Sequence, residues 1–556
     1  MYSNNNTLKN MKNYLCILLF FCPMMAYAVK VEIDGLCYEI VGKNKPVTVI
    51  CKNSDPNWNY NKLTGDIVIP ETVTYEGITY TVNAIGKQAF YGCKMVSISI
   101  PNTVTEIGIG AFDGCSKLKT IKLPEEIKEI KTITFSGCGS LKEITLPSKL
   151  EIIGDNAFSS CGFTTIIIPN TVKRIENEAF ARCSGLISVS LPNSISFIGD
   201  YAFGQCELLK TVNIPSGITT LPNGMFSGCN SLEEIVIPSN ITSIGALVFW
   251  NCSSLNKIQI PVSVTSINYQ FIQNCPSLST IIVEDGNPIY DSRNNCNGII
   301  ETASNTYICG CKNSLIPESV TTIGRLAFYN CKELEYISFP NSLKKIDVSA
   351  FEGCEKLSLI SFSNNIEELG SAVFRNCTGL KKILIPGCIK QIGYYVFYDC
   401  SNLVEVIIED GITEIPNSMF TGCTNIESIT IPSSIKKVGY SAFSGCGNLD
   451  KFYCHAIDVP NIESGVKRSI FHNSYIQYAT LYVPESSIDK YRAESPWNEF
   501  GNILAIESSG ISTVNNTDAQ FDVYNLNGQR LKSKTTTFGG LPSGLYIVNG
   551  NKVLKK

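Results

Sequence analysis

Histidine is almost absent from this chain: only His455 and His472 occur among its 556 residues. Because histidine is the base of most serine and cysteine triads, such sites are excluded from the long stretch before His455. Charged residues are also few, at 17%, and a net charge of -4 gives no basic surface for nucleic acid. The composition therefore leaves little room for histidine-based catalysis or for nucleic-acid binding.

Long apolar runs are absent after residue 28. Before that point, a basic stretch precedes the run LCILLFFCPMM, which ends in the small-residue sequence AYA. This pattern predicts a signal peptide over 1–28, with Met11 as an alternative start, and the run is too short to span a membrane. Neither Cys16 nor Cys22 follows a small residue, so no lipoprotein anchor is expected. We therefore expect an exported chain.

One phrase repeats about every 22 or 23 residues, and its clearest copy is IPNTVTEIGIGAFDGCSKLKTIKLP, from Ile100 to Pro124. A period of this size is typical of a solenoid. Each copy carries a Phe followed three residues later by a Cys, except where Phe271 and Cys275 are spaced by four. We expect these pairs to form a core ladder that includes Phe90 and Cys93, Phe112 and Cys115, Phe180 and Cys183, Phe351 and Cys354, and Phe420 and Cys423.

Each repeat is predicted to form one turn of a coil. The segment after the Cys, with Leu118, Ile121 and Leu123 in one copy, alternates apolar and polar residues as a half-buried strand does. The Pro that follows has no N–H to donate, so it ends the strand. A second short apolar segment comes next, at Val104 and Ile107 in its copy. One turn buries too little surface to be stable alone, so neighbouring turns must stack.

The repeated phrase resembles that of the BspA-like leucine-rich repeats, IPxxVTxIGxxAFxxCxxLxxI, over roughly Gly65 to Asp450. The resemblance implies a mainly β, right-handed leucine-rich-repeat solenoid of about 15 to 17 turns, with a parallel sheet on its inner face. It also implies a surface-exposed binding or adhesion role in a bacterium of the Bacteroidota.

The two ends depart from the repeat, as the caps of a solenoid must. The C-terminal cap carries Tyr482, Tyr491, Trp497 and Phe500, which we expect to close the last turn. The predicted segments are a signal peptide at 1–28, an N-terminal cap at 29–64, a first repeat block at 65–283, an enlarged variant repeat at 284–317, a second repeat block at 318–453, a C-terminal cap at 454–507, and a linker with a tail at 508–556.

The tail alternates like short strands joined by Asn-Gly and Pro-Ser-Gly turns. It resembles the C-terminal sorting module of Bacteroidota surface proteins, matched by VYNLNGQRL at 523–531, LPSGLYIV at 541–548 and the terminal KVLKK. It is shorter than the fuller module and lacks a leading Pro-rich signature. The resemblance implies export by the type IX route, and a plain terminal β module is the alternative.

Most of the 24 cysteines lie on the ladder, where stacked turns place them roughly 4.8 Å apart with parallel side chains. That spacing exceeds the Cβ separation of a disulfide, so we expect buried thiols. Disulfides stay open for Cys37 with Cys51, and among Cys296, Cys309 and Cys311. Zinc at the second group would lack an evident fourth ligand and has no nearby histidine.

The variant repeat is more than twice the usual length. Its residues Asp285, Asp291, Asn294 and Asn295 have spacings that suit calcium, although such residues more often form Asx turns and the calcium-loop template is not matched. Its segments IIET and TYICG are predicted strands that pair with the main sheet.

Repeat phase identifies the outward positions of the predicted strands, which form two columns rich in Ser and Thr. Their carboxylates Glu143 and Glu234 lie four turns apart, about 19 Å, which is too far for a glycosidase pair. Apolar and charged outward residues gather in the second block. We take six of them as candidate binding residues: Tyr336, Leu359, Lys382, Leu384, Glu405 and Ile407. Single exposed aliphatic residues are common on surfaces, so an ordinary surface is the alternative.

These features predict a non-enzymatic cell-surface or secreted protein for adhesion or protein binding, with host matrix, mucin or other cells as partners. No cofactor, metal or nucleic acid is expected. Association with a membrane is expected only through export or anchoring. The alternatives are glycan binding for polysaccharide capture, for which Tyr336 and Tyr453 are too few and too far apart, and a structural surface-layer role. An enzyme site in the C-terminal cap, around His455, His472, Asp458 and Glu463, has no assignable nucleophile.

Overall fold

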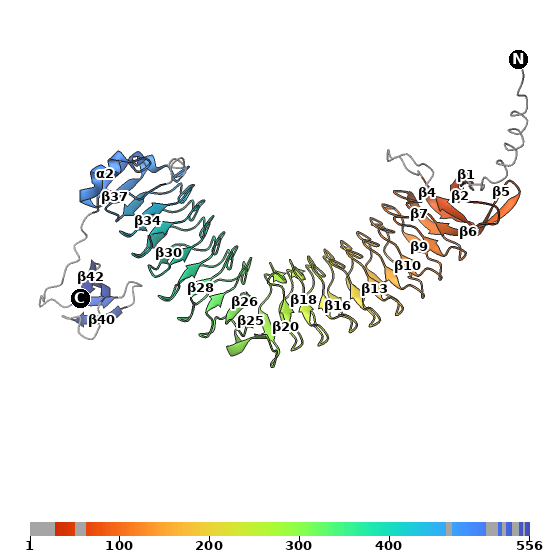
Figure 1. Ribbon diagram of the computed structural model, residues 1–556, viewed down its shortest axis with the longest axis horizontal. Coiled ribbons are helices and arrows are strands. Elements are labelled where there is room, and N and C mark those ends of the chain that lie inside the picture. The colour runs from red at the N-terminus through yellow and green to blue at the C-terminus, as the bar shows by residue number, and fades with distance from the viewer. Residues whose placement is uncertain are drawn as a thin grey trace, which may run out of the picture. The chain divides into compact units, whose positions relative to one another are not determined.

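The computed structural model describes residues 28–50, 63–462 and 470–506, together with four tail strands. The predicted signal peptide except its last residue, Cys51, Glu463 and the predicted linker lie outside the described residues. The chain divides into two compact units, the first made of Met1–Leu380 and Lys390–Cys400, the second of Lys381–Ile389 and Ser401–Lys556. Within each unit, successive turns stack side by side as a β-solenoid (Figure 1). The described part of the chain forms about 18 turns, slightly more than predicted, and the mainly β leucine-rich-repeat fold is confirmed.

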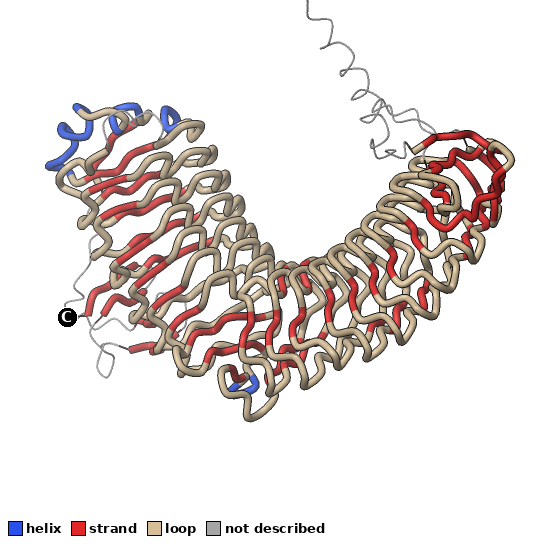
Figure 2. Tube along the Cα trace, turned by 45° about the vertical axis from the view of Figure 1, so that its right-hand side comes forward, coloured by secondary structure: helices blue, strands red, loops and turns tan. Residues whose placement is uncertain are grey.

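In both units, most turns contribute short strands to two faces, with loops between them (Figure 2). The segment that ends at the repeat Pro forms what we call the strand face. The second apolar segment of the repeat forms mostly two-residue strands, which we call the second face. Neighbouring strands on both faces are parallel and pair turn to turn, as Thr165 with Ser188 and Arg174 with Phe197.

The first unit begins with a sheet in which antiparallel strands lead into the solenoid, where β3 pairs in parallel with β6. Its strands are β1 (Val29–Ile33), β2 (Leu36–Ile40), β3 (Val47–Ile50), β6 (Ile78–Ile85) and β5 (Thr72–Tyr75), with β8 (Glu106–Ile107) beside β6.

The strand face of the first unit is divided among three separate sheets. These are β4 (Thr64–Val68) with β7 (Lys94–Ser99) and β9 (Thr120–Lys122); β12 (Thr165–Ile167) with β14 (Ser188–Ser190) and β16 (Thr211–Val212); and β20 (Lys257–Ile260) with β23 (Thr280–Val283). Between them, and again at Tyr336 and Leu359, the strand face has only isolated bridges.

The second face of the first unit contains longer ladders of very short strands. Its strands are β10 (Glu129–Ile130), β11 (Ile152–Ile153), β13 (Arg174–Ile175), β15 (Phe197–Ile198), β17 (Thr220–Leu221), β18 (Ser243–Ile244), β21 (Ser266–Ile267), β27 (Thr322–Ile323), β28 (Lys345–Ile346), β29 (Glu368–Leu369) and β31 (Gln391–Ile392). The strands β19 (Phe249–Trp250) and β22 (Ile272–Gln273) pair separately.

The variant repeat forms an antiparallel hairpin, contributed by β24 (Tyr290–Asp291), β25 (Gly298–Glu301) and β26 (Thr306–Gly310), with the 3-10 helix η1 (Arg293–Asn295). Strand β26 then pairs in parallel with β27. The strands predicted from IIET and TYICG are present, and they join the second face through β26.

The second unit has one uninterrupted sheet on its strand face. Its six strands, in order, are β30 (Lys382–Ile385), β32 (Glu405–Ile408), β34 (Ser428–Ile431), β36 (Lys451–Cys454), β37 (Thr480–Val483) and β38 (Asn502–Ala505). Its second face carries β33 (Glu414–Ile415) and β35 (Lys437–Val438). The C-terminal cap thus extends the strand face with β37 and β38 instead of only covering its end.

The described helices of the cap are short: η3 (Ile476–Tyr478), η4 (Glu485–Ser487), α2 (Ile488–Ala493) and η5 (Trp497–Glu499). Tyr491, Trp497 and Phe500 are buried beneath them, and Trp497 packs edge-on against Phe452 of the last repeat at 5.8 Å. Tyr482, which we expected in this core, points outward on β37 instead and is only half-buried.

The tail forms its own antiparallel sheet, in the order β40-β39-β41-β42. Its strands are β39 (Phe521–Tyr524), β40 (Arg530–Thr535), β41 (Gly544–Val548) and β42 (Asn551–Lys555).

Candidate functional site

The predicted Phe residues form stacks along the core of the solenoid. Phe90 and Phe112 lie 5.3 Å apart between ring centroids, and Phe328 and Phe351 lie 4.9 Å apart, in both cases with nearly parallel rings. In the variant repeat Tyr307 takes the place of the Phe and stacks on Phe328 at 5.4 Å. In the cap, Phe471 continues the stack beyond the last repeat at 5.6 Å from Phe443. All these rings are buried, so they hold the turns together and are not available to a ligand.

The ladder cysteines are free thiols, all buried except Cys275 and Cys331, which are partly buried, and most donate a hydrogen bond to a backbone carbonyl of the preceding turn. The acceptor is the carbonyl of the preceding ladder Phe, as from Cys115 Sγ to Phe90 at 3.0 Å and from Cys377 Sγ to Phe351 at 3.1 Å. The same bond is made by Cys138, Cys161, Cys183, Cys206, Cys229, Cys252, Cys275, Cys354, Cys400 and Cys446. The sequence indicated small apolar residues here, but the thiol also donates a second hydrogen bond to a carbonyl that already accepts one from a backbone N–H, as Phe90 does from Cys93.

Burial also makes these thiols unreactive. It raises the pKa of Cys138 and of Cys183 to about 12, and it raises that of Cys161 well above the usual value. A nucleophilic cysteine needs a lowered pKa and access to solvent. The ladder therefore has a structural role.

The candidate binding residues lie outward on the strand face, but the two units divide them. In the first unit, Tyr336 and Leu359 face each other across an isolated parallel bridge and are 60% and 56% exposed. In the second unit, Lys382 and Leu384 on β30 are in register with Glu405 and Ile407 on β32.

In the second unit, an outward column that begins with Leu384 and Ile407 crosses the whole sheet. The register pairs Leu384 with Ile407, Ile407 with Thr430, Thr430 with Tyr453, Tyr453 with Tyr482 and Tyr482 with Leu504. We call these six residues the apolar stripe. At about 4.8 Å between strands, the stripe runs roughly 24 Å. A row of this length with Leu384 and Leu504 each 49% exposed is unusual for a solvated sheet.

Tyr453 and Tyr482 stand side by side in the stripe. Their ring centroids are 4.7 Å apart and their planes differ by 13°, so one face of each ring covers the other. The sheet register places Thr430 and Leu504 on the outer sides of the pair. The rings thus offer mainly their edges to a ligand, an arrangement that suits packing against protein side chains better than a flat platform for sugar.

A polar column runs beside the stripe along the same strands. It contains Lys382, Glu405, Ser428, Lys451, Thr480 and Asn502. Lys382 Nζ forms an ion pair with Glu405 Oε2 at 2.8 Å, and this hydrogen bond raises the pKa of Lys382. The strand face of this unit therefore has an apolar centre line with a charged margin, which is the usual composition of a protein-binding surface.

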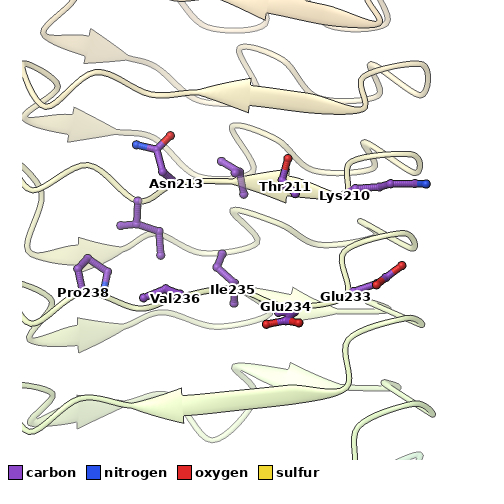
Figure 3. A pocket seen from close by; sticks show the side chains of 10 residues that line it. Lys210, Thr211, Asn213, Glu233, Glu234, Ile235, Val236 and Pro238 are labelled. Atoms are coloured by element: carbon purple, nitrogen blue, oxygen red, sulfur yellow. The ribbon is translucent and has the colours of Figure 1, made fainter.

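The first unit has grooves on its strand face where its sheets are interrupted. Figure 3 shows the larger one, of about 620 Å³, with Lys210, Thr211 and Asn213 on one turn and Glu234 and Val236 on the next. The sheet that ends at β16 stops here, and the next turn contributes only the bridge from Glu234 to Lys257.

A second groove of about 490 Å³ lies along Thr120, Glu143 and Thr165, again beside an interruption of the sheet. Each groove has one strongly exposed aliphatic residue, Val236 at 81% and Ile167 at 83%. In these two grooves the exposed aliphatic residues are therefore separate points among polar side chains, whereas Tyr336 and Leu359 form a pair elsewhere on this face.

Among the residues considered for calcium, Asp291 is engaged by a neighbouring arginine. Both carboxylate oxygens of Asp291 accept hydrogen bonds from Arg293, and this lowers the pKa of the carboxyl against the effect of burial. Cys296, Cys309 and Cys311 are separate buried thiols, whereas Cys51 lies outside the described residues, so its pairing with Cys37 stays a prediction. Within residues 28–50, 63–462 and 470–506, no group of three or more His, Cys, Asp or Glu residues is placed to hold a metal ion.

Of the cap residues considered for catalysis, Asp458 has a side-chain partner, and the hydrogen bonds of His455 and His472 are made by their backbone. Asp458 Oδ1 accepts a hydrogen bond from Lys490 Nζ at 2.7 Å. The backbone carbonyl of His472 accepts hydrogen bonds from Gly445 N and Ser444 Oγ, and the N–H of His455 bonds Ile431. Burial lowers the pKa of His455, which opposes its protonation. These contacts give no arrangement of base and nucleophile.

The stacked parallel turns, with a buried Phe and Cys ladder and a broad strand face, define a leucine-rich-repeat solenoid. The comparison with protein families identifies the kind of repeat: the model of the BspA type leucine-rich repeat region matches residues 67–187, 173–292, 300–425 and 370–492. The chain therefore belongs to the BspA type leucine-rich repeat family.

Solved structures of leucine-rich repeat proteins are similar to this chain. One from Bacteroides ovatus has 28% identity over 82% of this chain and 100% of its own, with a TM-score of 0.41. A leucine rich cell surface protein from Faecalibacterium prausnitzii has 27% identity over 80% of this chain and 97% of its own, with a TM-score of 0.45. A search of the curated proteins gave no match. No helix among the residues that the structure describes is long and apolar enough to cross a membrane.

Sequence reasoning missed the part of the apolar stripe that lies in the cap. Repeat phase predicted outward Leu384, Ile407, Thr430 and Tyr453, but it ends with the last repeat. Tyr482 and Leu504 lie on β37 and β38, whose register follows only from the fold. The alternation TLYVP, with its terminal Pro, was the available signal, because it matches the strand segment of a normal repeat.

Proposed function

We propose that this protein is a non-enzymatic, exported binding protein that attaches to another protein through the strand face of its second unit. The observation that carries the proposal is the apolar stripe across six hydrogen-bonded strands. The stripe combines two leucines, an isoleucine and a tyrosine pair with a charged margin. Interfaces draw most of their affinity from a few such anchors, among which tyrosine is enriched.

Adhesion to host matrix protein, mucin or another cell is the setting we propose for this binding. Membership of the BspA type repeat family and the signal-peptide pattern support a place on the cell surface or in the medium. The tail supports export by a type IX route in a bacterium of the Bacteroidota, because its sequence resembles a sorting module and its described strands form a separate antiparallel sheet.

The stripe favours a protein partner over a polysaccharide. A sugar stacks on an exposed ring face, whereas Tyr453 and Tyr482 cover each other. A structural surface-layer role would use the stripe for contacts between copies of the chain. The two roles differ in whether binding to a foreign protein saturates.

The test is binding of the full exported chain to arrayed matrix proteins, mucins and glycans, followed by variants of the stripe. We expect saturable binding to a protein ligand, and a loss of at least about 30-fold when Leu384→Asp and Ile407→Asp are combined, because two hot-spot anchors are removed. The matched control is Ile167→Asp with Val236→Asp, which places the same charges on the strand face of the first unit. Unchanged binding by the stripe variant, at an unchanged melting temperature, would remove the stripe from the proposal.

Export is tested separately by protease treatment of intact cells with detection of the repeats. Loss of the repeats from intact cells, or their presence in the medium, supports surface exposure or secretion. Full protection until the cells are broken would contradict both and leave a role inside the cell envelope.

A further inference from the structure

Two strongly exposed tyrosines lie together in the C-terminal cap, just before β37, and neither belongs to the apolar stripe. Tyr475 is 56% exposed and Tyr478 is 81% exposed, and both border a hollow of about 450 Å³. The other residues that line the hollow belong to the last repeat: Gly447, Asn448, Leu449 and Asp450. The hollow therefore joins aromatic rings from the cap to polar side chains from the repeat.

The backbone of the last repeat and the cap holds the two sides of the hollow together. Thr480 N donates to Asp450 O at 2.8 Å, which ties the start of β37 to the segment before β36. Tyr478 N donates to Tyr475 O at 2.9 Å, which closes the turn that carries both rings. At Gly447 a side chain would lie 3.8 Å from the ring of Tyr475, so the ring lies next to this turn. Main-chain contacts thus fix the backbone of the turn from which both rings extend.

The polar side of the hollow is the end of an asparagine ladder. Asn425 Nδ2 donates to Asn402 Oδ1 at 3.4 Å, and Asn448 Nδ2 donates to Asn425 Oδ1 at 3.1 Å. The ladder ends at Asn448, whose Oδ1 accepts no hydrogen bond from the described residues and whose amide keeps a second N–H. Beside it, the Asp450 carboxylate is 65% exposed, and its nearest cation is Lys451 Nζ at 3.7 Å. An amide and a carboxylate with unused capacity therefore lie next to two exposed rings.

We propose that this hollow is a saccharide-binding site that takes a neutral pyranose of one or two residues. A pyranose has a face of C–H groups that packs on an aromatic ring, and a margin of hydroxyls that both donate and accept hydrogen bonds. Tyr475 and Tyr478 supply the rings, the Asp450 carboxylate accepts from hydroxyls, and Asn448 both accepts and donates. The volume is within the range of small-molecule sites. The carboxylate disfavours acidic sugars and phosphates.

This site is independent of the proposed protein partner. None of its residues belongs to the stripe, so a protein ligand on the stripe and a sugar in the hollow do not require each other. A chain with both sites would hold a glycosylated partner at two points, which raises overall affinity through effective concentration.

The experiment titrates the full chain with the methyl glycosides of glucose, galactose, mannose, fucose, N-acetylglucosamine and N-acetylgalactosamine, at up to about 10 mM, followed by ligand-observed NMR. We expect at least one glycoside to bind saturably. Tyr478→Ala should weaken that binding at least about tenfold, and Asp450→Ala should weaken it by a similar factor, because each removes one of the two kinds of contact.

The matched control is Tyr440→Ala, which removes another exposed tyrosine of the same unit, 48% exposed. It should leave glycoside binding unchanged, and all variants should keep the melting temperature of the parent, because the side chains removed are exposed. The proposal is overturned if no glycoside binds, or if binding persists at full strength in Tyr478→Ala. It is also overturned if the stripe variant Leu384→Asp with Ile407→Asp abolishes glycoside binding while Tyr478→Ala does not.

Discussion

The strand face of the second unit is one sheet of six paired strands, whereas that of the first unit is divided among separate short sheets. The outward residues differ in the same way. Leu384, Ile407, Tyr453, Tyr482 and Leu504 form a row in the second unit, while Ile167 and Val236 are isolated points in the first. Both units contain the ladder of stacked Phe and buried Cys, with Tyr307 in place of one Phe in the first unit. The core therefore specifies the turns, and the outward positions are free to serve binding.

Alkaline pH should lower the free energy of unfolding of both units. We expect this to be the largest effect, because many buried thiols contribute to it. An unfolded cysteine ionises near pH 8.5, whereas burial raises the pKa of Cys138 in the first unit to about 12 and that of Cys454 in the second to about 11. Between these values the folded chain binds more protons than the unfolded chain, so stability is full below about pH 8.5 and falls as pH rises, by about 1.4 kcal/mol per pH unit for each thiol.

Urea denaturation from neutral pH to about pH 10 measures this loss, and Cys138→Ser should make its pH dependence shallower by one proton. A free energy of unfolding that stays constant over this range would contradict the role given to the ladder.

Removing one ring from the stack should cost the same in each unit. Phe351→Ala in the first unit and Phe443→Ala in the second each remove a buried ring with stacked neighbours on both sides. We expect each to lower the free energy of unfolding by about 3–5 kcal/mol, measured by denaturant titration. A cost below about 1 kcal/mol in one unit only would mean that the cores of the two units differ, and not only their strand faces.

Removing one ladder thiol should have a smaller effect, again in both units. Cys161→Ala and Cys446→Ala remove the thiol hydrogen bonds to the carbonyls of Phe135 and Phe420, which keep the bonds from the backbone N–H groups of Cys138 and Cys423. We expect each to cost about 0.5–1.5 kcal/mol, the net value of one hydrogen bond, and the corresponding Ser variants, whose hydroxyl donates, to recover part of the loss. Equal stability of the Ala and Ser variants would mean that the thiol serves only as an apolar filler.

The smallest effect should distinguish the strand face of the second unit from that of the first. Thr430 is the one polar residue of the apolar stripe, and Ser190 holds the corresponding outward position in the first unit. Thr430→Lys should weaken binding of a protein ligand about tenfold, because a charge enters the centre of the interface, and Ser190→Lys should change it less than about twofold. Surface plasmon resonance on both variants measures the change in affinity. Equal effects would mean that the strand faces of the two units do not differ in binding.

Much of the fold could be predicted because the period of the repeat can be seen in the sequence. The spacing of Phe and Cys gave the turn, the alternation before each Pro gave the strand, and the outward columns followed from phase. The candidates Lys382, Leu384, Glu405 and Ile407 do lie outward on paired strands. The hollow at Tyr475 could not be predicted, because it joins cap residues to Asn448 and Asp450 across a segment that has no repeat phase.

From its residues alone, the chain specifies a stacked β coil, since the same apolar positions recur in every copy and can be buried only against their neighbours. Folding in three dimensions settles where this coil has continuous and interrupted sheets, because pairing depends on how each turn lies against the next. It also brings Tyr482 beside Tyr453 and turns the thiols toward carbonyls one turn away. Contacts between residues of different turns depend on how the turns stack, and the repeated sequence does not determine that geometry.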